Sequence, residues 1–352
     1  MTVTALIASS DARLRDDLLR LAAAADAPAE IARHPDHVRA RWHRAGLVLV
    51  GDDLAADLAG VPRRGGVALV TRAGDPDVYR RALAIGAQDL VVLPDDEPWL
   101  LDALSSAAEP VDGDGVTVCV TGARGGAGTS VLAASLALTA ARAGRRTLLV
   151  DADPAGGELD VLLGLEDEPG ARWHELAARR GRLSPSTLRE ALPSVGEFAV
   201  LTGAADTAVS GDAAASVLDA AARGFDLTVV DVPRAPGPVG TPALRAASVT
   251  YVVLPAEVRP ALAARRHLRS LTDLSTDVRL IVTTPSPGGL SPQAVADGLP
   301  VPLAGALEHD SRLRTSLEHG DLVHCLRRGP LMTLCESLLS TLTPTTALRE
   351  AA

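Results

Sequence analysis

The sequence predicts an α/β protein built from two doubly wound domains, a small one followed by a larger one with a mostly parallel sheet. Three observations lead to this fold class. Short apolar runs alternate with helical patterns in both halves, a polar stretch rich in Gly and Asp separates the halves, and a glycine-rich turn then links a strand to a helix. We therefore place the first domain at residues 1–108, a linker at 109–115, the second domain at 116–345 and a tail at 346–352.

The first domain has the pattern of a small doubly wound unit. Its strands are short apolar runs bounded by turn residues, and its helices have apolar residues at helical spacing. We expect helices over residues 11–24 and 75–85, and strands over 3–8, 46–50, 66–70 and 89–93.

The same alternation continues on a larger scale after the linker. Residues 116–120, 130–143 and 146–150 form a strand–helix–strand unit, whose crossover is expected to be right-handed. The helix is apolar almost all round, which predicts that it is buried against the sheet. Further strands are expected over 198–201, 227–231, 250–254 and 279–283.

The composition narrows the class of protein. The chain has 352 residues, of which 47% are hydrophobic and 22% charged, as in ordinary globular proteins. No apolar run reaches the roughly 18 residues of a membrane span, and no signal-peptide pattern opens the chain. Cys119, Cys325 and Cys335 are not spaced as a metal site, and the histidines are scattered. We therefore expect a cytoplasmic protein without a structural metal.

The basic residues are all arginine. The sequence contains 34 of them and no lysine, and its net charge is −10. Because phosphate neutralisation needs local positive charge, this balance argues against broad nucleic-acid binding.

The glycine-rich turn lies in residues 118–130. Its glycines let the backbone turn tightly and approach a phosphate without a clash from a Cβ atom, and the following helix adds its positive end. The Ser130 hydroxyl stands where a P-loop holds Mg²⁺. A tight turn without a ligand is the alternative. We expect the phosphates to contact Gly125, Gly126, Ala127, Gly128, Thr129 and Ser130.

Two later strands end in aspartates. Asp151 and Asp153 follow the strand over 146–150, and Asp231 ends the strand over 227–231. Carboxylates at these strand ends can hold Mg²⁺ directly or through water. Any one of them is compatible with a solvated strand end, but the loop and the acids in this order predict a nucleotide site. We expect Ser130, Asp151 and Asp231 to surround the metal.

Together these motifs resemble the MinD/ParA/CpaE family of deviant Walker ATPases, which are P-loop proteins of the SIMIBI type. The resemblance covers roughly residues 115–325, and the first domain makes the chain similar to the CpaE branch, in particular to its actinobacterial septum site-determining members. It implies ATP and Mg²⁺ as cofactors, a homodimer formed through the nucleotide face, and a role in septum placement or in Flp-pilus and secretion machinery. Partners of those machines would then recruit the protein to the septum or membrane. The segments that carry the resemblance are 124–130, 151–154, 231–233, 252–257 and 303–310.

The loop departs from the family pattern at both lysines. Arg124 occupies the signature position, which in the family reaches across a dimer to the partner's nucleotide, and arginine keeps the charge there. Thr129 replaces the loop lysine, so we expect nucleotide binding with weak or absent hydrolysis. By resemblance, Asp153 positions the attacking water and Arg124 acts in catalysis.

Base selectivity is also affected. The glutamine that often follows Asp-Pro in the family is Ala155, and the adenine-contacting asparagine is replaced by Thr283 or Thr284.

The first domain resembles a response-regulator receiver that has lost its chemistry. The strand over 46–50 leads to Asp52 and Asp53, one of which would be the phospho-acceptor. A working receiver also needs an acidic pair after its first strand and a lysine after its last. Here the first strand leads only to Ser9-Ser10-Asp11 and the last to Leu93-Pro94. We expect a pseudo-receiver used for docking or dimerisation, the alternative being an unrelated small α/β domain.

Two further features suggest partners. Arginines at 259, 265, 266 and 269 cluster on one expected helix, which we interpret as a solvated face in preference to a DNA-binding patch. The segment over 331–339 is expected to pack on the core, since the tail after it lacks the positive charge of a membrane-binding helix.

Three functions follow from these observations. The leading one is an ATP-responsive regulator of septum placement or pilus assembly. The alternatives are a structural adaptor that works without nucleotide and a DNA-partitioning ATPase.

Overall fold

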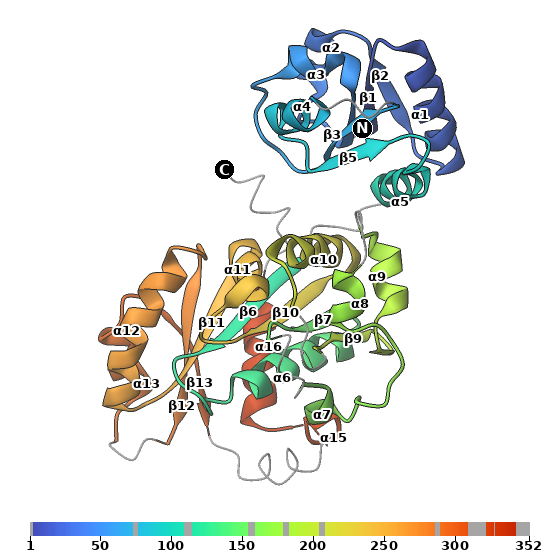
Figure 1. The fold of residues 1–352 in the computed structure, drawn as a ribbon. Coiled ribbons are helices and arrows are strands. Elements are labelled where there is room, and N and C mark those ends of the chain that lie inside the picture. The colour runs from blue at the N-terminus through green and yellow to red at the C-terminus, as the bar shows by residue number, and fades with distance from the viewer. Residues whose placement is uncertain are drawn as a thin grey trace. The chain divides into compact units, whose positions relative to one another are not determined.

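The computed structural model describes residues 3–72, 77–108, 115–153, 159–178, 183–203, 208–285, 289–308, 322–326 and 328–342. Two compact units divide the chain (Figure 1), and the expected α/β class with a mostly parallel sheet is confirmed. The first unit comprises Met1–Pro110 with Arg180–Ser184, and the second comprises Val111–Arg179 with Pro185–Ala352.

The first unit is a parallel sheet covered by helices on both faces. Its strand order is β2-β1-β3-β4-β5, the order of flavodoxin-like receivers. Alternate residues of the strands face opposite ways, so Leu47 and Leu49 join one core while Val48 and Val50 join the other. The strands are β1 (Val3–Ala8), β2 (Ala29–Ala32), β3 (Ala45–Gly51), β4 (Val67–Thr71) and β5 (Asp89–Val92).

The helices of this unit divide between the two cores. Helices α1 (Ala12–Ala24) and α5 (Glu97–Ala108) bury one face of the sheet. The other face is covered by α2 (Pro35–Arg41), α3 (Asp52–Ala55), η1 (Ala56–Leu58) and α4 (Val78–Ile85). The helix expected over 75–85 begins at Val78, and positions 75–76 lie outside the described residues.

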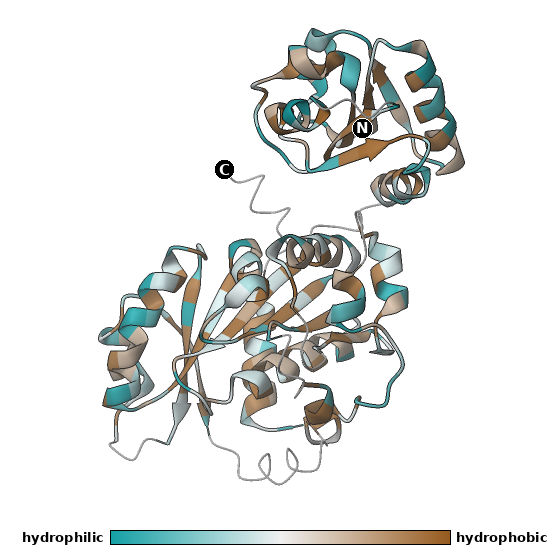
Figure 2. Ribbon diagram, in the orientation of Figure 1, coloured by the Kyte–Doolittle hydropathy of each residue, from teal (hydrophilic) through white to brown (hydrophobic). Residues whose placement is uncertain are grey.

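The second unit has an eight-stranded sheet in the order β13-β12-β11-β6-β10-β7-β9-β8, parallel except for the β8–β9 pair. Its central strands are hydrophobic along their length (Figure 2) because helices cover both faces. The strands are β6 (Val116–Gly122), β7 (Thr147–Asp151), β8 (Ser194–Val195), β9 (Phe198–Leu201), β10 (Leu227–Val232), β11 (Val249–Pro255), β12 (Val278–Thr284) and β13 (Leu303–Glu308).

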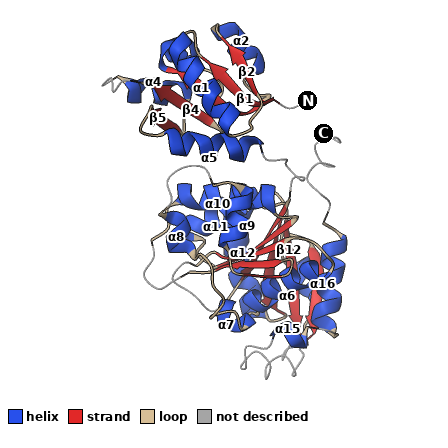
Figure 3. Ribbon diagram, turned by 90° about the vertical axis from the view of Figure 1, so that its right-hand side faces the viewer, coloured by secondary structure: helices blue, strands red, loops and turns tan. Residues whose placement is uncertain are grey.

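The helices of the second unit form two layers around the sheet (Figure 3). Helix α6 (Thr129–Arg142) has nine buried residues and lies beside α16 (Pro330–Ser340) on one face, as expected for both segments. Helices α10 (Gly211–Gly224) and α11 (Gly237–Ala246) pack together on the other face. The other helices among the described residues of this unit are α7 (Leu159–Leu163), α8 (Trp173–Ala177), α9 (Pro185–Ala191), α12 (Val258–Thr272), α13 (Pro292–Asp297) and α15 (Leu322–Cys325).

Within the described residues, no helix is both long enough and apolar enough to cross a membrane.

Candidate functional site

The glycine-rich loop leaves the central strand β6 and enters α6 at Thr129. Gly126 and Gly128 have φ values of 69° and 88°, in the left-handed region that other residues rarely adopt. A Cβ atom built at Gly125, Gly126 or Gly128 meets no atom of the described residues within 4 Å. At Gly126 and Gly128 the requirement for glycine therefore comes from the backbone conformation and not from close packing. The side of the loop that a Cβ would occupy is therefore open to a ligand at the positive end of α6.

The base of the loop is fixed to the neighbouring strand. The N–H of Ala123 donates to the carbonyl of Val253 on β11 at 3.0 Å. Gly122 is required for close approach, because a Cβ there would come within 2.6 Å of the Thr129 hydroxyl. Thr129 thus lies against the end of β6, where its side chain supplies a hydroxyl and no charge.

The strand-end aspartates meet beside the loop. Asp231 and Asp151 are registered partners in the ladder between β10 and β7. The Asp231 carboxylate accepts a hydrogen bond from Ser130. Asp151 is 7% exposed, and its Oδ1 accepts the N–H of the exposed Asp153 at 2.9 Å. The expected metal residues Ser130, Asp151 and Asp231 therefore lie at one edge of the sheet, with Asp153 next to them.

Electrostatics at this edge favour a bound cation. The pKa of Asp231 is raised to about 6, mainly by burial and also by the charge of Asp153, and the Ser130 hydrogen bond only partly offsets both effects. A cation between these groups would relieve the repulsion.

The donor set fits Mg²⁺ in particular. Hydroxyl and carboxylate oxygens are hard ligands, and Mg²⁺ in nucleotide sites is bound by one or two protein oxygens together with substrate phosphates. In the described part of the chain, no group of three or more His, Cys, Asp or Glu is placed to hold a metal ion unaided. Ser130, Asp231 and Asp151 would thus hold a metal whose coordination the nucleotide phosphates complete.

Arg124 points to a neighbour in its own chain. Its guanidinium lies 3.7 Å from Glu257, between β11 and α12, and both side chains are substantially exposed. An exposed pair at this distance contributes little stability, typically about 0–1 kcal/mol. Arg124 therefore stays near the loop and can leave Glu257 at small cost.

Two of the three residues that stand where the family has its glutamine and its adenine-contacting asparagine lie within the described part of the chain. Thr283 and Thr284 end β12, half-buried, two strands away from β6 in the sheet. Ala155 lies outside the described residues.

The two aspartates that follow β3, Asp52 and Asp53, are both engaged by contacts within the first unit. Asp53 accepts from the hydroxyls of Ser9 and Ser10 at 2.8 and 2.6 Å, and from two backbone N–H groups of the same turn. Although burial opposes it, these bonds lower the pKa of Asp53. Asp52 forms a bidentate ion pair with Arg81 on α4. Leu93 follows β5 where a receiver carries lysine.

The arginine cluster lies on α12, which contains no acidic residue. Arg259, Arg265, Arg266 and Arg269 are all exposed, as expected of a solvated face. No ion pair joins any of the four to another described residue.

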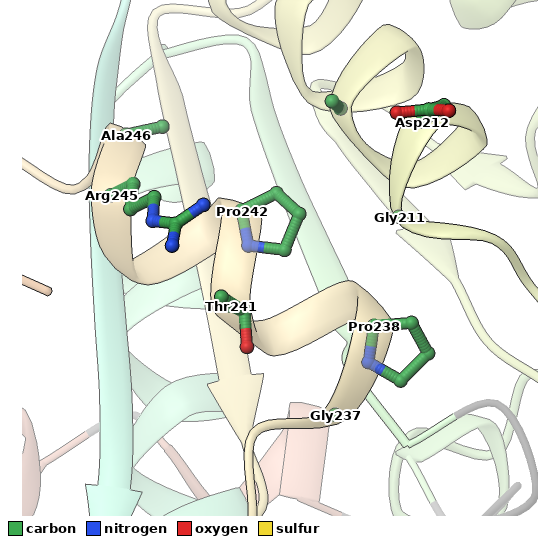
Figure 4. Close-up of a pocket in the computed structure, with 9 residues that line it drawn as sticks. Gly211, Asp212, Gly237, Pro238, Thr241, Pro242, Arg245 and Ala246 are labelled. Atoms are coloured by element: carbon green, nitrogen blue, oxygen red, sulfur yellow. The ribbon is translucent and has the colours of Figure 1, made fainter. Parts of the chain in front are cut away.

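A separate cavity of about 700 Å³ opens between α10 and α11 (Figure 4). Asp212 of α10 and Thr241 and Arg245 of α11 line it. None of the loop or carboxylate residues contributes to its lining, so it is distinct from the phosphate site.

Two contacts of the site were missed from the sequence. Glu257 pairs with Arg124, and the Trp173 indole donates to the Asp151 carbonyl at 2.7 Å. Glu257 ends the segment 252–257 that carries the resemblance, but no pattern marked it as a partner of Arg124, and Trp173 belongs to no motif. The one available signal was the scarcity of aromatic residues, which make up 2% of the chain.

Both units of the chain are similar to known proteins. Residues 118–323 match the family described as the CobQ/CobB/MinD/ParA nucleotide binding domain, and residues 8–115 match the Rv3660c-like, CheY-like N-terminal domain. The Mycobacterium tuberculosis protein Rv3660c is 38% identical over 343 residues, covering 95% of this chain and 96% of its own. The expected receiver-like domain is thereby confirmed as CheY-like, and the alternative of an unrelated small domain was wrong.

Two solved structures show the same fold in the second unit. The septum site-determining protein MinD of Pyrococcus horikoshii, complexed with Mg-ADP, has a TM-score of 0.54 and 19% identity, covering 64% of this chain and 97% of that one. A chain of the MinC:MinD cell division protein complex of Aquifex aeolicus has a TM-score of 0.55 and 20% identity, covering 65% of this chain and 97% of that one.

Proposed function

Because the chain belongs to the CobQ/CobB/MinD/ParA nucleotide-binding family, with a CheY-like domain in front, we propose that it is an ATP-responsive regulator. ATP with Mg²⁺ binds at the loop of residues 124–130 and favours a dimer through the nucleotide face. That dimer recruits proteins of septum placement or of pilus and secretion machinery.

One observation carries the nucleotide site. The Ser130 hydroxyl, in the first turn of α6, donates to the Asp231 carboxylate at the end of β10. This joins the phosphate loop to the acid that would hold Mg²⁺, directly or through water. The Mg-ADP complex of the Pyrococcus MinD supports the choice of cofactors.

Because the loop lysine is missing, we expect the protein to act by binding nucleotide and not by rapid hydrolysis. A charged hydrogen bond is worth about 1.5–3 kcal/mol, so Thr129 weakens phosphate binding by roughly tenfold to a hundredfold. Cationic stabilisation of phosphoryl transfer is larger, on the order of 10³–10⁵ in rate for an arginine finger. Hydrolysis therefore suffers more than binding, although Asp153 is present.

Arg124 supplies a mobile cation for a dimer. In the single chain it pairs with Glu257 across 3.7 Å. Breaking this exposed ion pair costs little, so a contact with the nucleotide of a second chain can replace it. The dimer proposal predicts that Arg124 leaves Glu257 and reaches the nucleotide of the partner chain.

The CheY-like domain acts in docking. Asp53 is already saturated by Ser9, Ser10 and the turn N–H groups, and Leu93 offers no charge. We therefore assign it to protein contacts and not to phosphotransfer.

Titration with a fluorescent ATP analogue, with and without Mg²⁺, tests the proposal. Saturable binding that strengthens with Mg²⁺, and self-association that requires ATP, are expected. Self-association that is unchanged by ATP and by Asp231→Ala would favour the structural adaptor instead.

A further inference from the structure

Trp173 links the ends of two neighbouring strands at the carboxyl edge of the second sheet. The β7–β9 ladder has its last registered pair at Val150 and Leu201. One residue further on, the backbone N–H of Trp173 donates to the carbonyl of Thr202 at 3.1 Å. Its indole Nε1–H donates to the carbonyl of Asp151 at 2.7 Å. Trp173 is 0% exposed, so water does not compete for these bonds.

The peptide unit between Asp151 and Ala152 is thereby held on both sides. Its carbonyl accepts from Trp173, while its N–H donates to the carbonyl of Asp231 at 2.9 Å. The next N–H, that of Asp153, donates to the Asp151 carboxylate. The orientation of this one peptide therefore determines where the side chains of Asp151 and Asp153 lie relative to Asp231.

A second set of contacts holds the residues next to Trp173 and its backbone partner Thr202. Asp160 is 8% exposed, and its Oδ2 lies 3.3 Å from the Thr202 hydroxyl and 4.0 Å from the Arg172 guanidinium. The backbone N–H of Arg172 donates to Glu175 at 2.8 Å and so fixes the start of α8. Trp173 is thus rigid at both its backbone and its ring, which is what a positioning role requires.

We propose that Trp173 is a positioning residue of the phosphate site, whose indole N–H sets the Asp151–Ala152 peptide and so aims the Asp151 and Asp153 carboxylates at a Mg²⁺–nucleotide. This inference rests on the proposed nucleotide binding. Trp173 acts through the backbone of Asp151 and contributes no ligand of its own.

If Trp173 has this role, it should affect only one of two contributions to the affinity for ATP, namely the one that depends on Mg²⁺. The loop N–H groups bind phosphate without metal, whereas the gain in affinity from Mg²⁺ depends on the carboxylates. Trp173→Phe keeps an aromatic ring but leaves the buried Asp151 carbonyl without its donor. We expect it to reduce the Mg²⁺-dependent gain in ATP-analogue affinity by about tenfold, while affinity in EDTA changes little.

The chain offers a matched control. Trp42 is 1% exposed in the first unit, and its indole donates to the carbonyl of Pro62 at 2.9 Å. Trp42→Phe removes another bond from a buried indole to a backbone carbonyl, partly buried and away from the site, so it should leave the Mg²⁺-dependent gain unchanged. An equal gain in Trp173→Phe and wild type would overturn the inference, whereas a wild type that binds no nucleotide would overturn the proposed function.

A second measurement leaves Trp173 in place, in case Trp173→Phe does not fold. The chain has three tryptophans, so Trp42→Phe combined with Trp99→Phe leaves Trp173 as the only tryptophan, which excitation at long wavelength selects over the two tyrosines. Its emission should shift on addition of ATP and Mg²⁺, and less with ATP in EDTA. Identical spectra under both conditions, at saturating nucleotide, would contradict a contact between Trp173 and the carboxylate turn.

Discussion

Asp231→Asn should stabilise the metal-free protein, because the ionised Asp231 carboxylate is partly buried and lies near the charge of Asp153. Burial first, and then the charge of Asp153, raise its pKa from 3.8 to about 6. That rise corresponds to about 3 kcal/mol at about 1.36 kcal/mol per pH unit. Since Asp231 is half-buried, we expect a gain of about 1–3 kcal/mol in the free energy of unfolding.

The pH dependence has a definite sign. Between pH 3.8 and about 6 the folded protein binds more protons at Asp231 than the unfolded chain does, so its contribution to stability is full below pH 3.8 and is lost as pH rises to about 6. Asparagine keeps the shape and cannot ionise. The advantage of Asp231→Asn should therefore be largest at pH 8 and disappear near pH 4.

Thermal unfolding in EDTA at pH 8 and pH 4 measures this effect. In a domain of this size, about 1 kcal/mol corresponds to about 2–4 °C in Tm. Asp226→Asn is a control of opposite sign: although burial opposes it, hydrogen bonds from Arg146 lower the pKa of Asp226, so its loss should destabilise at pH 8. An Asp231→Asn variant no more stable than wild type at pH 8 would refute the electrostatic account of the site.

Three further predictions concern the loop. Thr129→Lys should tighten ATP-analogue binding by about tenfold to a hundredfold, measured by titration. It should also raise the rate of phosphate release in a steady-state ATPase assay. Unchanged affinity would contradict the assigned phosphate contact. Arg124→Ala should leave the nucleotide affinity of the single chain nearly intact but abolish ATP-dependent self-association. Glu257→Gln should increase that self-association, because it releases Arg124. Both are followed by analytical ultracentrifugation, and equal behaviour of the two variants would argue against a cation acting in trans. Gly128→Ala should lower nucleotide affinity because φ is 88° there, and a binding curve that matches wild type would show that the loop conformation is not required.

The regular elements could be predicted closely because their signals are local. Strand β9 and strand β1 have the predicted bounds, and the other predicted strands differ by one or two residues at their ends. Helix α6 was predicted from its glycine turn and its apolar surface. Strand β2 was missed, because its four residues alternate weakly and include the exposed Ile31 on the edge of the sheet.

Only those parts of the site that belong to sequence motifs could be predicted. The loop and the strand-end aspartates are signalled by position in the chain, and parallel strands bring them together. The two supporting contacts, Arg124 with Glu257 and Trp173 with Asp151, join residues 133 and 22 positions apart. No periodicity marks such pairs, since tertiary packing alone determines them.

Nucleotide binding by the intact chain is the most direct test of the central claim. The measurement is a titration with a fluorescent ATP analogue in Mg²⁺ and in EDTA, on wild type, on Asp231→Ala and on Asp226→Ala as the control outside the site. We expect saturable binding that is stronger in Mg²⁺, with the Mg²⁺ effect lost in Asp231→Ala and kept in Asp226→Ala. Absence of saturable binding at millimolar nucleotide, or a Mg²⁺ effect that survives in Asp231→Ala, would contradict it.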